Sequence, residues 1–466
     1  MFKKNKKENG LSIIVVGCGK VGMALVEQLS KEGHDITIID TNREKVQIIA
    51  NQYDVMGLAG NGASYSVQIE AGIEKSDLII AVTGSDELNL LCCTIAKHVG
   101  NCSTIARVRT PDYSIEARYL REKLGLSMII NPELESALEA TKILCLPHAL
   151  HVNSFAHGQV EMIQLKIEDK NYLDGMTIAD FGKSREFAIL ICAIERDEEV
   201  FIPSGDFIMK KGDIVYFVAP RKSSKAFMNK IGLKTTRVKN TMIIGGGRAS
   251  YYLAKNLINM GIDVKIIESS RERCEELSVL LPKCVVINGD GTDEELLLEE
   301  GIQEAESFVP LTGIDEENVM LTMYAKQVSN AKVITKIRRG NFKNVINRLD
   351  LGSVIYPRYI TAEAIIAYVR AKNASKSSNI ETLYKLFDSR AEAIEFQVDE
   401  ESKVTNIPLS ELSLKKDLLI AFINRNEEIL IPNGQDCIKA GDSVIIVTKH
   451  TGFTNILDIL EGLESL

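Results

Sequence analysis

Short apolar runs alternate with amphipathic stretches through the first part of the chain. The run from Ile13 to Val16 consists mostly of β-branched residues, which predicts a buried parallel strand. The stretch after it has apolar residues on one helical face and ends at Gly33, which predicts a helix, and the apolar positions 36–39 predict a second strand that ends at Asp40. The same alternation predicts helices over 43–51, 90–98 and from about 133, and strands over 54–58, 78–82 and 104–108. This order is typical of a doubly wound parallel sheet.

The pattern of apolar residues changes from Phe155 onward. The segment VEMIQLKIE alternates apolar and polar residues, and residues 187–195 form a further strand-like run. Gly205 and the pair Gly212-Asp213 separate the strand runs that follow. This pattern predicts a small β-rich domain with a few helices.

The whole pattern occurs twice. Gly17 and Gly245 lie 228 positions apart, as do Asp40 and Glu268. Further pairs lie 229 positions apart: Gly60 and Gly289, Asp86 and Asp315, Asn89 and Asn318, Arg109 and Arg338, and Pro203 and Pro432. A duplication of this length means that an α/β domain followed by a β-rich domain is the repeated unit. Two copies in one chain suggest pseudo-twofold packing.

The predicted fold class is therefore α/β, with two Rossmann-like doubly wound parallel-sheet domains, each followed by a small β-rich α+β domain. We place the first Rossmann-like domain at 11–132, a connecting helix or linker at 133–151 and the first β-rich domain at 152–234. The second set comprises 238–357, connecting helices at 358–388 and 389–466.

The glycines at the end of the first predicted strand indicate a nucleotide site. Gly17, Gly19 and Gly22 have GxGxxG spacing, in which the first permits a tight turn, the second admits a pyrophosphate and the third lets the helix approach the strand. The carboxylate of Asp40 can accept hydrogen bonds from ribose hydroxyls. The alternative is a tight βα turn with no ligand.

Both copies carry a cation in this loop, Lys20 in the first and Arg248 in the second. Phosphate contact is one interpretation of these residues, and a solvent-facing loop position is the other. The second loop has Gly245 and Gly247, but Ser250 replaces the third glycine. Its backbone amides should therefore hold phosphate less closely, and the two sites should be unequal.

Polar residues follow further predicted strands. The loop TGSDELN begins at Thr83, and Arg107 ends a strand, where parallel sheets form their ligand crevice. The counterpart of Arg107 is Lys336, which cannot make the same bidentate contact with phosphate. Asn61 in the first copy corresponds to Asp290 in the second. For Asp86, repeated as Asp315, helix capping competes with ribose or cation binding.

Composition and charge narrow the classes of function. The 466 residues carry a net charge of -9, which argues against a nucleic-acid partner. No apolar run approaches the roughly 18 residues of a membrane-spanning helix, and the Lys-rich start reads as a solvated tail. The nine cysteines include no CxxC pair, so neither a disulfide framework nor a zinc ribbon is indicated.

Three further features have residue types that could carry chemistry, and we expect each to have a structural role instead. Cys18 lies where a helix N-terminus can lower a thiol pKa, but it is expected to fill space. Tyr251 and Lys255 form a YxxxK pattern, which is attributed to chance. The group Cys145, His148, His151 and His157 has metal-ligand residue types, with two histidines on a possible shared helix face, but an interdomain linker is preferred.

The glycine loop with Asp40, the TGSDELN loop, the ARVRTPDY strand end and the segment PSGDFIMKKGD together resemble the TrkA family. Members are tandem RCK (KTN) proteins and serve as peripheral regulatory subunits of Trk-type potassium uptake systems. The resemblance covers 11–451. It implies NAD(H) as cofactor, with ATP or ADP as further ligands, and a homo-oligomeric ring beneath an integral membrane potassium transporter. It also implies a cytoplasmic location, peripheral to the membrane and without insertion.

The sequence thus predicts a non-enzymatic, nucleotide-sensing gating subunit. The alternative is an NAD(H)-dependent oxidoreductase, for which no substrate domain is evident. The resemblance carries over Gly17, Gly19, Gly22 and Asp40 as dinucleotide contacts and Arg107 as a phosphate neighbour. No catalytic or metal-binding residues are predicted. The complete set of expected site residues is Gly17, Gly19, Lys20, Val21, Gly22, Asp40, Asn61, Thr83 and Arg107 in the first copy and Gly245, Gly247, Arg248, Glu268 and Asp290 in the second.

Overall fold

The computed structural model describes residues 10–462 except 112, 114, 115, 147, 169, 170, 184–188, 232, 234–236, 340–342, 347, 378, 388, 389 and 427. The Lys-rich start, the predicted start of a strand at 187 and the predicted domain ends at 234, 388 and 466 lie outside these residues. The chain divides into two compact units. One comprises the residues up to Thr141 with Lys239–Tyr368, and the other Lys142–Val238 with Val369–Leu466.

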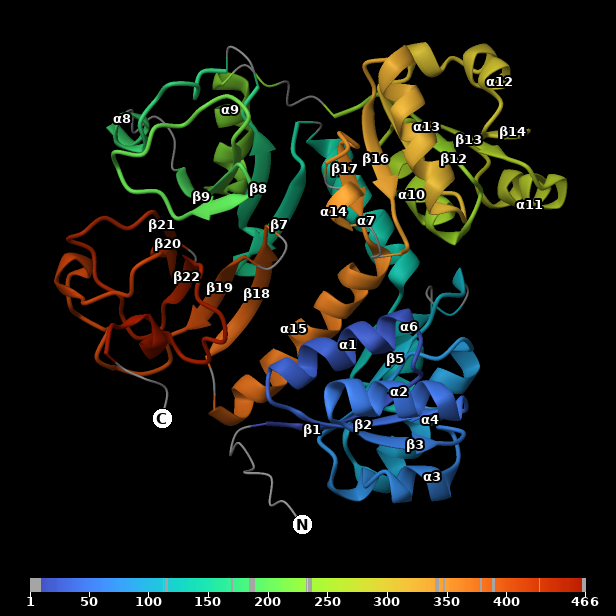
Figure 1. The fold of residues 1–466 in the computed structure, drawn as a ribbon, viewed down its shortest axis with the longest axis horizontal. Coiled ribbons are helices and arrows are strands. Elements are labelled where there is room, and N and C mark those ends of the chain that lie inside the picture. The colour runs from blue at the N-terminus through green and yellow to red at the C-terminus, as the bar shows by residue number, and fades with distance from the viewer. Residues whose placement is uncertain are drawn as a thin grey trace. The chain divides into compact units, whose positions relative to one another are not determined.

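The first half of the first unit is a six-stranded parallel sheet (Figure 1). Its strand order is β3-β2-β1-β4-β5-β6, the order of a classic dinucleotide-binding fold. The strands are β1 Ser12–Val16, β2 Asp35–Asp40, β3 Met56–Ala59, β4 Leu78–Ala81, β5 Ser103–Arg107 and β6 Met128–Ile130. The helices are α1 Lys20–Lys31, α2 Arg43–Tyr53, α3 Tyr65–Glu70, α4 Asp86–Gly100, α6 Ala117–Leu124 and α7 Pro132–Cys145, with a 3-10 turn at Ile73–Lys75.

Local sequence explains where these elements begin and end. The side chain of Asn42 caps α2 by accepting a hydrogen bond from the Lys45 amide at 3.0 Å, and Asp54 ends the helix with a left-handed φ of 53°. The predicted boundaries at 51 and 54 are therefore wrong by two residues each. Helix α4 begins at Asp86, four residues before its predicted start, because the Ser85 hydroxyl caps it at the Leu88 amide.

The second copy repeats this sheet in the order β14-β13-β12-β15-β16-β17. Its strands are β12 Asn240–Ile244, β13 Asp263–Glu268, β14 Val285–Asn288, β15 Ser307–Pro310, β16 Lys332–Lys336 and β17 Ser353–Ile355. Its helices are α10 Arg248–Asn259, α11 Arg271–Leu280, α12 Glu294–Glu299, α13 Asp315–Val328, α14 Lys343–Ile346 and α15 Pro357–Ser377, with a 3-10 turn at Ile302–Glu304. A buried hydrogen bond of 3.0 Å from Asn131 Nδ2 to the Tyr252 hydroxyl joins the two copies.

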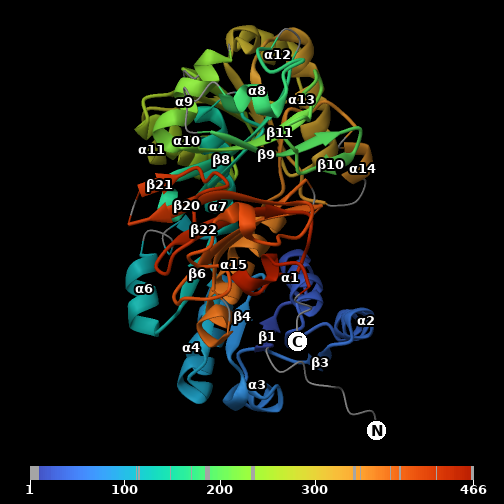
Figure 2. The ribbon, with the colours of Figure 1, turned by 90° about the vertical axis from the view of Figure 1, so that its left-hand side faces the viewer.

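The second unit contains two five-stranded antiparallel sheets with the same strand order, β10-β9-β11-β8-β7 and β18-β19-β22-β20-β21. Strands β8, β9 and β11 of the first lie side by side in Figure 2. The first sheet has β7 His151–Phe155, β8 Val160–Lys166, β9 Leu190–Arg196, β10 Glu199–Phe201 and β11 Ile214–Pro220, with helices α8 Ile178–Lys183 and α9 Arg221–Lys230. The second has β18 Ile380–Leu386, β19 Ala391–Gln397, β20 Leu418–Arg425, β21 Glu428–Leu430 and β22 Ser443–Thr448. Short 3-10 turns occur at Ala156–Gly158, Leu409–Glu411 and Ile456–Ile459.

The two antiparallel sheets share one hydrophobic core. The ring of Phe155 contacts Tyr384 edge to face with centroids 4.9 Å apart, and Tyr216 contacts Phe387 in the same way at 4.8 Å. The buried carboxylate of Glu395 accepts a hydrogen bond from the Ala156 amide of the other sheet at 3.1 Å. Equivalent domains from the two halves therefore fold against each other in this unit.

The predicted fold class is confirmed: two doubly wound parallel sheets, each followed in the chain by a small β-rich domain. Within the described ranges, no helix has the length and apolar character needed to cross a membrane.

Candidate functional site

The candidate site of the first copy lies at the carboxyl ends of β1 and β4. These strands are neighbours in the sheet although β2 and β3 separate them in sequence. The chain leaves their ends in opposite directions, and open α/β sheets bind ligands in the crevice that such a reversal creates.

The glycine loop depends on close backbone approaches. Gly17 has a φ of 104°, and a Cβ atom there would lie 2.9 Å from the amide nitrogen of Thr83. A Cβ atom on Gly22 would lie 1.9 Å from the carbonyl oxygen of Gly17. Around Gly19, by contrast, a Cβ atom would meet no atom within 4 Å. The first and third glycines thus allow strand, loop and helix to pack, and the second leaves open space above the loop.

Helix α1 offers its N-terminus to that space. Its N-cap, Gly19, supplies no capping side chain, and its first turn contains no acidic residue. Backbone amides in such a turn lack helical partners and favour an anion. Lys20, the first helical residue, is exposed, whereas Val21 is buried and packs into the core. Lys20 is therefore available to a phosphate and the Val21 side chain is not.

Asp40 lies at the carboxyl end of β2, beside the glycine loop. One carboxylate oxygen accepts a hydrogen bond from the Cys18 amide at 2.6 Å, and the other accepts one from the Asn42 amide at 2.8 Å. These bonds fix the carboxylate, and each oxygen keeps a further lone pair for a ribose hydroxyl.

Cys18 fills space beside this carboxylate. Burial, and then the charge of Asp40, raise the pKa of the Cys18 thiol to about 12. Cys18 is thus a buried, inert thiol.

Arg107 lies at the end of β5, beside Thr83. The Arg107 guanidinium donates a hydrogen bond to the Thr83 carbonyl. The buried side chain of Asn89 accepts from the Thr83 amide at 2.8 Å and donates to the Arg107 carbonyl at 2.9 Å. Asn89 therefore ties the ends of β4 and β5 together. Its recurrence as Asn318 was visible in the sequence, but its role was not predicted.

Charged groups gather beside Arg107. Burial raises the pKa of Glu133, and the charges of Arg109, Arg107 and Arg248 oppose this rise. Burial, and then Arg109, lower the pKa of Arg107. Among the described residues, neither Arg107 Nε nor Glu133 Oε2 has a hydrogen-bond partner, although both atoms are buried. Unsatisfied buried groups of this kind are suited to binding a polar ligand or water. Sequence reasoning did not single out Glu133 or Arg109 as site residues.

The second copy holds its carboxylate, Glu268, through the same two backbone positions as Asp40 in the first. Glu268 accepts hydrogen bonds from the Gly246 amide at 2.6 Å and the Ser270 amide at 2.7 Å. A Cβ atom on Gly246 would lie 3.0 Å from the Glu268 Cγ. It would lie closer still, 2.7 Å, to Leu277 Cδ1, so the second copy leaves little room for a side chain at the position that Cys18 occupies in the first.

The glycine loop and the end of β16 in the second copy differ from their counterparts in the first. The Ser250 hydroxyl, fully buried, donates a hydrogen bond of 2.5 Å to the Gly245 carbonyl. Lys336 Nζ donates to the Leu311 carbonyl at 2.5 Å, and burial followed by the charge of Arg338 lowers the Lys336 pKa to about 8. Gly247 and the exposed Arg248 lie at the start of α10, as Gly19 and Lys20 do in α1.

Asn61 and Asp290 lie in exposed turns after β3 and β14. Asn61 accepts a hydrogen bond from the Ala63 amide at 3.0 Å, and Asp290 accepts bonds from the amide and hydroxyl of Thr292 at 2.9 and 2.8 Å. No described contact joins either residue to its glycine loop. Their role as ligand contacts stays a prediction.

Asp86 has a structural role. Its carboxylate accepts hydrogen bonds from the amides of Arg109 and Thr110, both at 2.9 Å, and from the Thr110 hydroxyl at 2.8 Å. Burial would raise the Asp86 pKa, but these bonds outweigh it and hold the pKa below its usual value. The cap of α4 is Ser85, so the capping role proposed for Asp86 is wrong, and its role in ribose or cation binding stays a prediction.

The structure also bears on the histidine group and the YxxxK pattern noted in the sequence. His151 begins strand β7 and α7 ends at Cys145, so His148 and His151 do not share a helix face as envisaged. The described part of the chain has no group of three or more residues arranged to hold a metal ion. Lys255 Nζ donates to the Tyr251 hydroxyl at 3.4 Å, the neighbour contact expected four residues apart on a helix.

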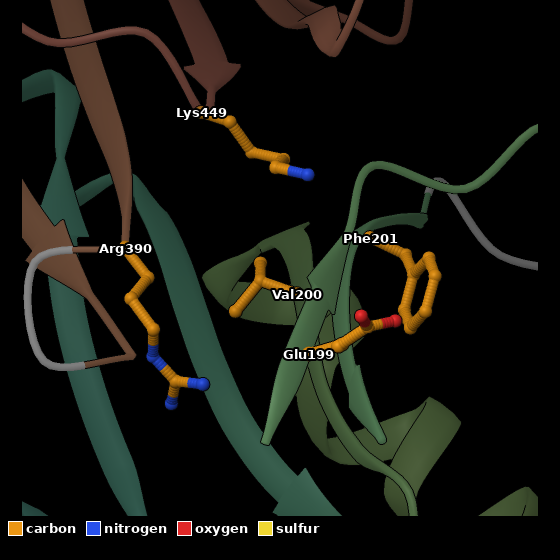
Figure 3. A pocket seen from close by; sticks show the side chains of 5 residues that line it. All are labelled: Glu199, Val200, Phe201, Arg390 and Lys449. Carbon is orange, nitrogen blue, oxygen red and sulfur yellow. The ribbon is translucent and has the colours of Figure 1, made fainter. Parts of the chain in front are cut away.

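A separate hollow of about 350 Å³ lies within the second unit. Glu199, Val200 and Phe201 line it from β10, and Arg390 and Lys449 line it from the other β-rich domain (Figure 3). Arg390 is engaged by the Glu195 carboxylate and the Glu198 carbonyl.

The family model of the TrkA-N domain matches residues 13–132 and 241–357, and that of the TrkA-C domain matches 162–232 and 393–460. The chain belongs to the TrkA family. This confirms the predicted family and its tandem order.

Named members of the family match this chain over nearly their whole length. The Trk system potassium uptake protein TrkA homolog 1 of Methanosarcina mazei is 32% identical over 455 residues, covering 96% of this chain and 99% of the relative. TrkA of Haemophilus influenzae is 30% identical over 443 residues, covering 94% and 95%.

Solved structures support the same fold. The GsuK RCK domain has a TM-score of 0.62 at 16% identity, covering 95% of this chain and 93% of that one. The GsuK channel bound to NAD has a TM-score of 0.61 at 16% identity, covering 95% and 77%.

Proposed function

We propose that this TrkA chain is the nucleotide-sensing regulatory subunit of a Trk-type potassium uptake system. One observation carries the proposal: in the first copy Asp40 lies beside an open glycine loop and Arg107 lies at the end of β5, beside Thr83, in a chain related throughout to Trk potassium uptake proteins. We further propose a cytoplasmic location at the membrane, reached through the partner.

The proposed ligand of the first copy is NAD(H). The ribose acceptor Asp40, the free N-terminus of α1 and the cations Lys20 and Arg107 follow the order of ribose and pyrophosphate in a dinucleotide. The solved GsuK channel with a similar fold is described as bound to NAD, which supports the choice. ATP and ADP present the same adenosine and phosphate chemistry, and we propose them as further ligands.

Ligand binding regulates by population shift. A nucleotide that binds one arrangement of the chain more tightly biases the equilibrium, and its differential affinity sets how far. The charges of Arg107 and Arg109 from the first copy and Arg248 from the second act on the same carboxylate, Glu133. A phosphate near Arg107 would change this balance, so both copies would sense it. No chemistry on the nucleotide is required, and we propose no enzymatic activity.

We propose that copies of the chain assemble through the Rossmann-like domains. Helix α13 exposes Met320 and Met323 on one face, and Ile314 is exposed just before its first residue. Leu91 is the exposed apolar residue on the equivalent α4. Apolar side chains in this number favour burial against another surface. The proposed partners are further copies in a ring and an integral membrane potassium transporter.

Native mass spectrometry of the full chain tests both parts of the proposal. A retained NAD(H) or adenine nucleotide and an oligomer mass are expected. A monomer that retains no nucleotide and binds none when titrated would contradict it. The runner-up, an oxidoreductase, would instead turn over bound NADH in the presence of a substrate.

A further inference from the structure

Arg273 is held rigidly at the ribose end of the second crevice. It is the third residue of α11, and its Nε donates a hydrogen bond to the Gly246 carbonyl at 2.7 Å. Its Nη1 lies 2.5 Å from the Glu276 carboxylate. Only 24% of the side chain is exposed. The guanidinium is therefore fixed between the glycine loop and α11.

Arg273 and Glu268 both form hydrogen bonds with the backbone of Gly246. Glu268 accepts from the Gly246 amide at 2.6 Å, and Arg273 donates to the Gly246 carbonyl. A ribose bound to the Glu268 carboxylate would therefore bring its base within reach of the guanidinium.

The first copy lacks this arrangement. Lys45, 228 positions before Arg273, is exposed, and its described hydrogen bond comes from its backbone amide to Asn42. Ile48 corresponds to Glu276 and is 63% exposed, so no carboxylate stands there to hold a cation.

A fixed guanidinium suits a purine base. The planar face of arginine stacks on aromatic rings, which the compact ammonium of lysine cannot do equally. The Glu268 carboxylate beside it disfavours a 2′-phosphate, so base stacking is the better use of this cation. The phosphate end of the same site is weakened by Ser250 and Lys336, which leaves more of the affinity to the base.

We propose that Arg273 is a specificity-determining residue of the second site, where it stacks on the base and favours purine over pyrimidine nucleotides, such as ADP over UDP. This inference rests on the proposed nucleotide binding. The first site, without a fixed guanidinium, reads the ribose and phosphates and discriminates less between bases.

Calorimetric titration of the full chain with ADP and with UDP tests the proposal. Arg273→Lys keeps the charge and removes the planar face. It should lower the ADP affinity of one site about three- to thirty-fold and change UDP affinity much less. The matched control, Lys45→Gln in the first copy, should leave the ADP-to-UDP preference of both sites unchanged.

A transplant provides the converse test. The quadruple variant Cys18→Gly, Asp40→Glu, Lys45→Arg, Ile48→Glu builds the second copy's arrangement in the first and should raise the ADP-to-UDP preference there. Equal losses of ADP and UDP affinity in Arg273→Lys would show that Arg273 only positions the loop and would overturn the inference. Unchanged ADP affinity would overturn it as well. If the unmodified chain bound neither NADH nor ADP, the proposed function itself would fail.

Discussion

The Ser250 hydroxyl donates a hydrogen bond of 2.5 Å to the Gly245 carbonyl. In the first copy the equivalent pair is Gly22 and Gly17, where a Cβ atom on Gly22 would lie 1.9 Å from the Gly17 carbonyl oxygen. The two loops therefore differ in local geometry. We expect α10 to stand farther from its strand than α1 and its amides to hold a phosphate less closely.

Exchanging these residues should change the two sites in opposite directions. Gly22→Ser forces backbone apart, so we expect a loss of about 1–3 kcal/mol in the free energy of unfolding and weaker NADH binding at the first site. Ser250→Gly permits closer approach and should not weaken the second site. Chemical denaturation and calorimetry measure these effects. An unaltered first site in Gly22→Ser would show that the close contact is unimportant.

Removing the Asp40 carboxylate should weaken nucleotide binding. The ribose would lose hydrogen bonds to a charged acceptor, each worth about 1.5–3 kcal/mol, so Asp40→Ala should reduce affinity about ten- to a hundred-fold. Asp35→Ala removes an exposed carboxylate at the other end of the same strand and serves as control. If calorimetry gave the same nucleotide affinity for Asp40→Ala and Asp35→Ala, Asp40 would not be a ligand contact. Tighter binding of NADP than NAD to the unmodified chain would lead to the same conclusion.

Exchanging the cations at the strand ends should make the sites more alike. Arg107→Lys replaces a planar fork by a point charge and should lower the NADH affinity of the first site several-fold. Lys336→Arg should raise affinity at the second. Calorimetric titrations of both variants against the unmodified chain check the pair. No change in either would mean that these residues do not contact phosphate.

The buried Lys336 makes stability depend on pH. Its folded pKa of about 8 lies below its ordinary 10.5, so the unfolded chain binds this proton more tightly than the folded chain. Below pH 8 the folded chain bears the full free-energy cost of burying the charged Lys336 ammonium. This cost falls as the pH rises from about 8 to 10.5, because the buried amine is then neutral. The free energy of unfolding should therefore rise by about 3 kcal/mol relative to Lys336→Met across this window. Urea denaturation at several pH values measures it, and a constant difference between the two proteins would contradict the assigned burial.

Much of the fold follows from local sequence. The β-branched run Ile13 to Val16 and the glycines after it define β1, the loop and α1, and the recurrence of Gly17 as Gly245 predicts the second copy. The errors in the predicted boundaries lie at helix ends, where a single residue decides at which position the helix begins or stops. Ser85 starts α4 early, and the left-handed Asp54 lets α2 run on.

The site was predicted less completely because its parts come from distant segments. Asn89 joins the ends of two strands, and Glu133 lies near arginine side chains from both copies. The pattern of apolar and polar residues along the chain reveals neither arrangement. Nothing in the sequence pattern singles out Arg273 in its polar helix, and only the fold brings it to the Gly246 carbonyl. The pairing of like domains, with Glu395 bound to the Ala156 amide, likewise needs the tertiary structure.

Potassium flux through the membrane transporter tests the central claim most directly. Proteoliposomes containing the transporter would be assayed with the full chain, with and without NADH, and with Asp40→Ala in its place. We predict that NADH changes the flux several-fold with the unmodified chain and much less with the variant. A flux that is the same with and without the chain, at every NADH concentration, would contradict the account.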